Sequence, residues 1–283
     1  MILITGATGT IGSEVVKRMS PAWPLRLMTR SPERVQAIGL SSEVIRGDYH
    51  DRSSLDVAVK GVDAALLITN NPLRDDDSAF LRACRNGGIR HVVKMSAAAV
   101  EDEQAHDLIR RWQRRNESLL RDSGLSWTLL RPRAFMSNTL SWSHSVRSEG
   151  VVRALFGTAP NACIDPGDVA AVAMHALTEP GHNGATYTLT GPQALSAQRQ
   201  TEELSRVLAR PVTFEELTVA QARSQWSSRY PEPVVDALLD SALRQQDGAK
   251  TQVTSTVRDV TGRAANTFAA WCGEHRHTFS ETR

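Results

Sequence analysis

The sequence predicts an α/β protein with a doubly wound parallel sheet and a smaller, mainly C-terminal helical lobe. Three observations predict this fold class. Short apolar segments of strand length alternate with segments of helical periodicity through the first 131 residues. A glycine-rich turn joins the first strand to the first helix. After residue 131 the alternation weakens, and from residue 195 onward the pattern predicts helices.

The first strand, at residues 2–4, is followed by glycines at three-residue spacing. Gly6 permits a tight turn, Gly9 allows the backbone to approach a pyrophosphate, and Gly12 allows the helix to pack close to the sheet. The N-terminus of that helix offers N–H groups and a positive dipole end to phosphates. The order of strand, turn and helix therefore predicts a dinucleotide-binding, Rossmann-type unit.

The second predicted strand, at residues 25–28, ends in Thr29 and Arg30. In proteins that bind NAD, an acidic residue near this position binds the 2′-hydroxyl of the ribose. No acid follows this strand, and the guanidinium of Arg30 is suited to the 2′-phosphate of NADP instead. The sequence therefore predicts NADP(H) as the cofactor.

The remaining elements continue the alternation. Carboxyl ends of parallel strands meet at one edge of the sheet, where ligands bind. We expect residues 1–131 to form the core, rejoined by residues 164–190, and residues 132–163 and 191–283 to form the lobe. The predicted strands are 44–46, 64–68, 89–95, 125–130 and 187–190, and the predicted core helices include 51–60, 80–85, 101–122 and one that starts near residue 165.

Composition excludes several classes of protein. The net charge of +2 does not indicate a nucleic-acid surface. The three cysteines and the histidines show no metal-ligand spacing and no disulfide framework, so we expect a reducing cytoplasm and no metal. We expect no signal peptide, because the first predicted strand starts at residue 2, and no membrane span, because no apolar run is long enough to cross a bilayer. A small-molecule substrate remains the expected partner.

The chain resembles the NmrA-like group of atypical short-chain dehydrogenase/reductases. The resemblance rests on the motifs ITGATGTIG, TRS, GD at 47–48, HVVKMSA, SGLSWTLLRPRAFMSN, IDPGDVAAVAMHAL, YTLTGPQALS and VTGRAANTFAAW, in that order. It implies cofactor contacts from Gly6, Thr8, Gly9, Thr10 and Ile11 to the diphosphate, from Arg30 to the 2′-phosphate, from Asp48 and Tyr49 to the adenine, from Thr69 and Asn70 to the ribose, and from Ser96 and Arg131 to the nicotinamide.

The resemblance also implies a substrate pocket formed by Phe135, Met136 and Trp142, each of which is equally compatible with a core position. Trp112 joins this set, because tryptophan rings offer flat faces for stacking. The wider superfamily uses a tyrosine and a lysine four residues later as the proton donor and its tuner. No Tyr-x-x-x-Lys occurs in this chain, so the weak candidates for a catalytic role are Ser96 and Lys94.

We therefore expect an NADPH-dependent reductase of a carbonyl or quinone-like group. The best candidate is a ketoreductase for an aromatic or polycyclic ketone of bacterial secondary metabolism, including antibiotic biosynthesis, in which the substrate or bound water supplies the proton. The alternative is a regulator that binds NADP(H) as a redox sensor without turnover.

Overall fold

The computed structural model describes residues 1–19, 22–36 and 42–280. The chain forms two compact units, each assembled from separate segments of the sequence. Unit 1 consists of Met1–Val100, Arg111–Pro132 and Pro166–Thr188, and unit 2 consists of Glu101–Arg110, Arg133–Asp165 and Leu189–Arg283.

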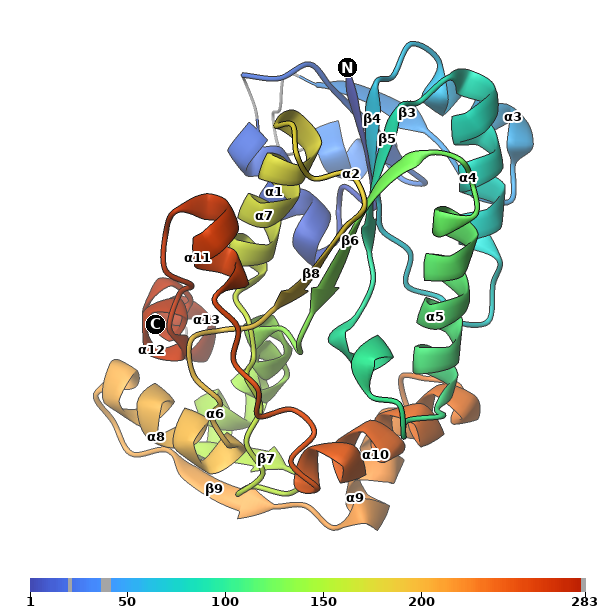
Figure 1. The fold of residues 1–283 in the computed structure, drawn as a ribbon. Coiled ribbons are helices and arrows are strands. Elements are labelled where there is room, and N and C mark those ends of the chain that lie inside the picture. Colours follow the sequence, from blue (N-terminus) through green and yellow to red (C-terminus); the bar gives the residue numbers. More distant parts are fainter. Residues whose placement is uncertain (20–21, 37–41, 281–283) are drawn as a thin grey trace. The chain divides into compact units, whose positions relative to one another are not determined.

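Unit 1 is built on a seven-stranded sheet with the strand order β3-β2-β1-β4-β5-β6-β8 (Figure 1). Neighbouring strands from β3 through to β6 pair in parallel, which confirms the predicted doubly wound fold. Each of the seven predicted strands is present. Their bounds are β1 (Ile2–Thr5), β2 (Leu25–Thr29), β3 (Glu43–Arg46), β4 (Ala64–Leu67), β5 (His91–Met95), β6 (Ser126–Pro132) and β8 (Ala185–Leu189).

Helices cover both faces of this sheet. In Figure 1, α1 and α7 pack together on one face, and α3, α4 and α5 lie on the other. The central strands are buried on both sides, so their apolar runs do not alternate with polar residues. The helices are α1 (Thr10–Met19), α2 (Pro32–Gln36), α3 (Arg52–Val59), α4 (Asp76–Gly87), α5 (Leu108–Arg121) and α7 (Pro166–Thr178).

The helix predicted at 101–122 is shorter than expected. The chain forms a 3₁₀ turn, η1 (Ala98–Glu101), then an irregular segment, and α5 begins only at Leu108. Asp107 explains this start, because its carboxylate accepts a hydrogen bond from the backbone N–H of Arg110 at 3.0 Å. Such side-chain capping satisfies a donor that the first turn leaves unpaired.

Unit 2 is mainly helical, but it also contains a two-stranded parallel sheet of β7 and β9 that the sequence analysis missed. The strand β9 is largely exposed, so it lacks the apolar alternation that predicts a strand. The elements of this unit are η2 (Met136–Trp142), α6 (Ser143–Glu149), β7 (Val151–Ala154), α8 (Ala197–Leu208), β9 (Thr213–Glu216), α9 (Val219–Ser227), α10 (Glu232–Gln246), α11 (Thr256–Thr261), α12 (Phe268–Glu274) and α13 (Arg276–Phe279).

Each unit has its own apolar core. In unit 1 the core lies between the sheet and helices α3 and α4, around Phe80 and Leu67. In unit 2 it joins η2, α8 and α12, around Met136, Leu204 and Trp271. Within the described ranges, no helix is both long enough and apolar enough to cross a membrane.

Candidate functional site

The turn between β1 and α1 has the geometry that close approach to a phosphate requires. Gly6 has a φ of +61°, in the left-handed region that favours glycine. A Cβ on Gly12 would lie 2.2 Å from the carbonyl oxygen of Gly6, so no larger residue fits between the helix and the turn. Thr8, Gly9 and Thr10 are exposed at the N-terminus of α1. This turn therefore fits the diphosphate of a dinucleotide.

The parallel sheet brings the other predicted cofactor residues to the same edge. Arg30 follows β2, Asp48 lies two residues beyond β3, and Thr69 lies two residues beyond β4. The guanidinium of Arg30 is exposed, and it forms no ion pair or hydrogen bond within the described ranges. A cation in this position is available to a 2′-phosphate. The individual cofactor contacts of these residues remain predictions.

Tyr49 is held differently from the exposed residues of this edge. Its hydroxyl donates a hydrogen bond to the carbonyl oxygen of Ile68 at 3.0 Å, and its ring packs edge-on against Phe80. Burial raises the pKa of the Tyr49 hydroxyl far above its usual value. In the same region, the Asp48 carboxylate accepts a hydrogen bond from the backbone N–H of His50, and Asn70 is exposed. Tyr49 therefore contributes a neutral ring rather than an acid.

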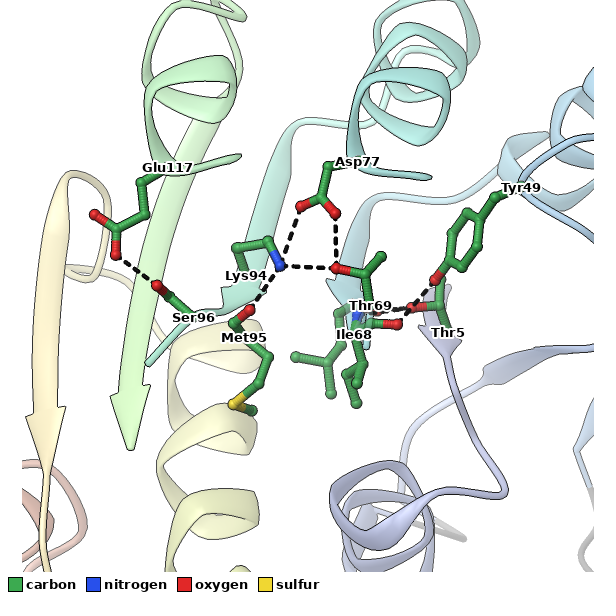
Figure 2. Close-up of polar contacts among 10 residues, drawn as sticks. Thr5, Tyr49, Ile68, Thr69, Asp77, Lys94, Met95, Ser96 and Glu117 are labelled. Atoms are coloured by element: carbon green, nitrogen blue, oxygen red, sulfur yellow. Dashed lines mark hydrogen bonds and ion pairs between the residues drawn. The ribbon is translucent and has the colours of Figure 1, made fainter. Parts of the chain in front are cut away.

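A buried ion pair lies beside the ends of β4 and β5 (Figure 2). The ammonium of Lys94 lies 3.0 Å from Asp77, and it donates hydrogen bonds to Thr69 at 3.1 Å and to the carbonyl oxygen of Met95 at 2.6 Å. Thr69 in turn donates to Asp77 at 2.6 Å. The ammonium therefore forms two hydrogen bonds and one ion pair, all of them buried.

Asp77 is the member of this cluster that the sequence analysis missed. It lies in the first turn of α4 and is 1% exposed. The sequence shows Asp75, Asp76 and Asp77 in a row, which indicates only the acidic start of a helix. Nothing in that run distinguishes the residue that contacts Lys94, since the pairing depends on a strand 17 residues away in the sequence.

Ser96 belongs to a second buried network. Its hydroxyl donates a hydrogen bond to Glu117 at 2.6 Å (Figure 2). Arg131 donates two hydrogen bonds to the same carboxylate, at 2.8 and 2.6 Å, and Arg121 donates a third at 3.0 Å. Burial alone would raise the pKa of Glu117, but the hydrogen bonds from Arg131 and Ser96 outweigh it and hold this pKa below its usual value.

The arrangement of Ser96 limits what it can do for a ligand. Its one hydroxyl proton points to an ionised carboxylate, so its remaining capacity is as a hydrogen-bond acceptor. That orientation suits the amide N–H₂ of a nicotinamide and does not suit a developing oxyanion. Glu117 orients Ser96, and this role was also not predicted from the sequence.

Helix α5 carries other side chains instead of the tyrosine and lysine of the wider superfamily. Gln113 is buried, and the ring of Trp112 lies with its centroid 5.7 Å from the ammonium of Lys94. This cation–π contact gives Trp112 a packing role in unit 1. Among the residues that the structure describes, no cluster of histidine, cysteine or acidic side chains is arranged to hold a metal.

The other three predicted pocket residues lie in unit 2. Met136 belongs to the apolar core and also lines a small hollow beside Cys163, Gln200 and Phe268. Trp142 is half-buried and packs against the same core. Phe135 is half-buried, and its backbone pairs with Ile164. Their contact with a substrate remains a prediction.

Comparisons with known proteins agree with this geometry. The profile of the NAD(P)H-binding family matches residues 6–180. The (4-alkanoyl-5-oxo-2,5-dihydrofuran-3-yl)methyl phosphate reductase of Streptomyces griseus subsp. griseus is 52% identical over 280 residues, which cover 99% of each chain. The NAD(P)H azoreductase of Xenophilus azovorans is 33% identical over 287 residues, again 99% of each chain. Among solved structures, the quinone oxidoreductase QOR2 of Escherichia coli, complexed with NADPH, has a TM-score of 0.85 and 26% identity, over 98% of this chain and 100% of that chain.

Proposed function

This chain belongs to the NAD(P)H-binding family, and from that premise we propose that it reduces a phosphorylated, electron-poor lactone. It is an NADPH-dependent oxidoreductase with the fold of the NmrA-like proteins. The proposed substrate class is that of the Streptomyces griseus relative, an alkanoyl dihydrofuranone that carries a methyl phosphate group.

The chemistry of this substrate class suits a site without a strong acid. One carbon of the ring double bond carries both the lactone carbonyl and the alkanoyl carbonyl. Hydride addition at the other carbon leaves a negative charge that spreads over two carbonyl oxygens. A charge stabilised in this way needs less help from a protein oxyanion site or a general acid. The relatives named as an azoreductase and a quinone oxidoreductase act on groups that also accept hydride at an electron-poor π system.

The proposal rests on the buried interactions that Lys94 and Ser96 form beside β5. The Lys94 ammonium donates hydrogen bonds to Thr69 and to the carbonyl oxygen of Met95, and it forms a buried ion pair with Asp77. The hydroxyl proton of Ser96 is directed at Glu117. Neither weak candidate therefore has a proton to transfer without breaking a buried interaction, which favours a substrate that stabilises its own charge.

The residues of this chain then bind and orient. The glycine turn and Arg30 would hold the diphosphate and the 2′-phosphate of NADPH, which supplies a hydride when bound. Ser96, held by Glu117, would accept a hydrogen bond from the nicotinamide amide and so fix the orientation of the ring. Water supplies the final proton to the ring carbon between the two carbonyls, because the delocalised enolate is stable enough to be protonated by solvent.

The test is reduction of the alkanoyl dihydrofuranone methyl phosphate with NADPH deuterated at the transferred position. We expect oxidation of NADPH, a product that has gained one deuterium and one hydrogen, and the deuterium on the ring carbon that bears the methyl phosphate group. Deuterium on a carbinol carbon instead would indicate carbonyl reduction and contradict the proposal.

The same assay tests the two other functions considered in the sequence analysis, a ketoreductase and a redox-sensing regulator. A polycyclic aromatic ketone with no acidic hydroxyl beside its carbonyl should be reduced poorly, since Ser96 and Lys94 are both held in buried interactions and neither replaces the missing tyrosine. Turnover of that ketone without turnover of the lactone would favour the ketoreductase. Absence of turnover with either compound or with a quinone, together with equal affinity for NADPH and NADP⁺, would favour the regulator.

A further inference from the structure

Several cations in unit 2 have a carboxylate partner. Arg153 contacts both Glu149 and Glu215, and Arg244 donates two hydrogen bonds to Asp102, at 2.9 and 3.0 Å. Two cations of this unit, Arg133 and Lys250, are set below the surface and form no ion pair with any described residue. They therefore differ from the paired surface cations around them.

Arg133 is the first residue of unit 2 after β6. Its backbone N–H donates to the carbonyl oxygen of Leu189 at 2.8 Å, which fixes its position. The Nε of its guanidinium is buried and has no hydrogen-bond partner. Burial lowers the pKa of Arg133, and the more distant charges of Glu101 and Asp102 oppose this shift. A buried guanidinium N–H without a partner is costly unless a ligand accepts from it.

Lys250 follows α10 and is also mostly buried. Its ammonium donates one hydrogen bond, to the hydroxyl of Ser241 at 2.8 Å, so only one of its three protons has a partner. Burial lowers the pKa of Lys250 to about 8. Cys163 and Asp107 act to raise this pKa and Arg133 acts to lower it, which makes Arg133 one of the charges that Lys250 experiences.

Backbone hydrogen bonds bring the two residues into the same part of unit 2. Arg133 is joined to Leu189, Gly191 donates to Ala162 at 3.3 Å, and Ala162 donates to Lys250 at 3.0 Å. These contacts connect the segments that carry Arg133 and Lys250, two residues that are 117 positions apart in the sequence. The fold therefore places two like charges in one region, with Glu101, Asp102 and Asp107 nearby but no described carboxylate in ion-pair contact with either, and a bound anion would stabilise this arrangement.

We propose that Arg133 and Lys250 form the binding site for the phosphate group of the substrate, an inference that rests on the proposed function. A phosphate monoester carries nearly two negative charges and offers several acceptor oxygens. The guanidinium supplies a planar pair of donors, and the ammonium supplies a point charge that Ser241 orients. The cofactor does not need this site, because its own phosphates are assigned to the glycine turn and Arg30 in unit 1.

The kinetic test compares the phosphorylated lactone with its dephosphorylated alcohol. In the wild-type protein we expect kcat/KM to favour the phosphate ester. Arg133→Gln and Lys250→Gln should each reduce this preference about 10- to 100-fold, mainly through KM, because each removes a charge-assisted hydrogen bond. Arg133→Lys should retain part of the preference. Arg229→Gln removes an exposed cation of unit 2 and is the matched control.

A direct binding measurement separates this inference from the proposed function. Methyl phosphate is titrated into protein saturated with NADP⁺, so that the cofactor site is filled. We expect binding that weakens as the pH rises through about 8, where Lys250 loses its proton, and that is lost in Lys250→Gln. The titratable and charged groups around Lys250 are Cys163, Arg133 and Asp107, and none of them has a usual pKa between the titrations of phosphate and of Lys250.

The outcomes are distinct. If no lactone is reduced but methyl phosphate binds in the wild type and not in the variants, the proposed function fails and the anion site stands. If the wild type reduces the ester and the alcohol equally well and binds no methyl phosphate, the anion site is wrong while the reductase proposal stands. Loss of both substrates in equal measure in Arg133→Lys and Lys250→Gln would indicate a structural role and would overturn the inference.

Discussion

Two buried lysines, one in each unit, show opposite ways of placing a positive charge inside a protein. Lys94 in unit 1 is completely buried, donates two hydrogen bonds and forms an ion pair with the carboxylate of Asp77. Lys250 in unit 2 is mostly buried, but it has one hydroxyl partner and no carboxylate in contact. The charge on Lys94 is balanced within the protein, whereas the charge on Lys250 is left for a ligand. Burial alone therefore does not indicate function; the partners do.

Two arginines near the end of β6 repeat this contrast. Arg131 forms a two-bond contact with the fully buried Glu117, and that carboxylate also holds Ser96. Arg133, two residues later, has a buried Nε without a partner. Two positions of one motif, separated by Pro132, thus have different surroundings, because Glu117 binds Arg131 and no described carboxylate forms an ion pair with Arg133.

The largest expected effect comes from breaking the balanced pair. Asp77→Leu should lower the free energy of unfolding by about 3–5 kcal/mol, because it leaves Lys94 buried without its counter-charge. Urea unfolding measures this loss. The double variant Asp77→Leu, Lys94→Met should recover most of it, since it removes both charges. A loss below about 1 kcal/mol in the single variant would show that the pair does not stabilise unit 1.

The next effect concerns Arg30, an exposed cation of unit 1 that, like Lys250, forms no ion pair with a described carboxylate. Arg30→Ala should weaken NADPH binding by about 1.5–3 kcal/mol, or roughly 10- to 100-fold, and leave NADH binding unchanged. Calorimetric titration of both cofactors measures the difference. Arg85→Ala, an exposed cation on α4, is the control. Equal affinities for NADPH and NADH in the wild type would contradict the assignment.

A smaller effect of opposite sign is expected for Lys250. Lys250→Met should raise the free energy of unfolding by about 1 kcal/mol at neutral pH, because it removes a buried charge that no carboxylate balances. The folded pKa of about 8 lies below the usual 10.5, so the folded protein binds fewer protons between these values and the wild type gains stability there as the pH rises. The difference in the free energy of unfolding between Lys250→Met and the wild type should therefore decrease above pH 8, as measured by unfolding curves at several pH values. A destabilised variant would mean that the ammonium is structural, as Lys94 is.

The smallest expected effect is on catalysis through Ser96. Ser96→Ala should lower kcat less than about 10-fold, because the hydroxyl proton is directed at Glu117 and not at the substrate. Loss of a general acid would instead cost about 10²- to 10⁴-fold. Steady-state rates with saturating NADPH measure the effect, and Ser118→Ala on the exposed face of α5 is the control. A loss of the larger size, with NADPH binding intact, would show that Ser96 does donate a proton.

The nucleotide-binding part of this protein could be predicted from local features of the sequence. The glycine spacing, the strand before it and the position of Arg30 are local features, and parallel strands must end at a common edge. The alternation of strands and helices along the chain was therefore enough to predict which residues lie at that edge. Only the tertiary structure decided which charges are balanced. Asp77, Glu117 and Ser241 acquire their roles through partners on other elements. No pattern of spacing marks them, because a buried pair depends on the distance between two side chains in space and not on their separation along the chain.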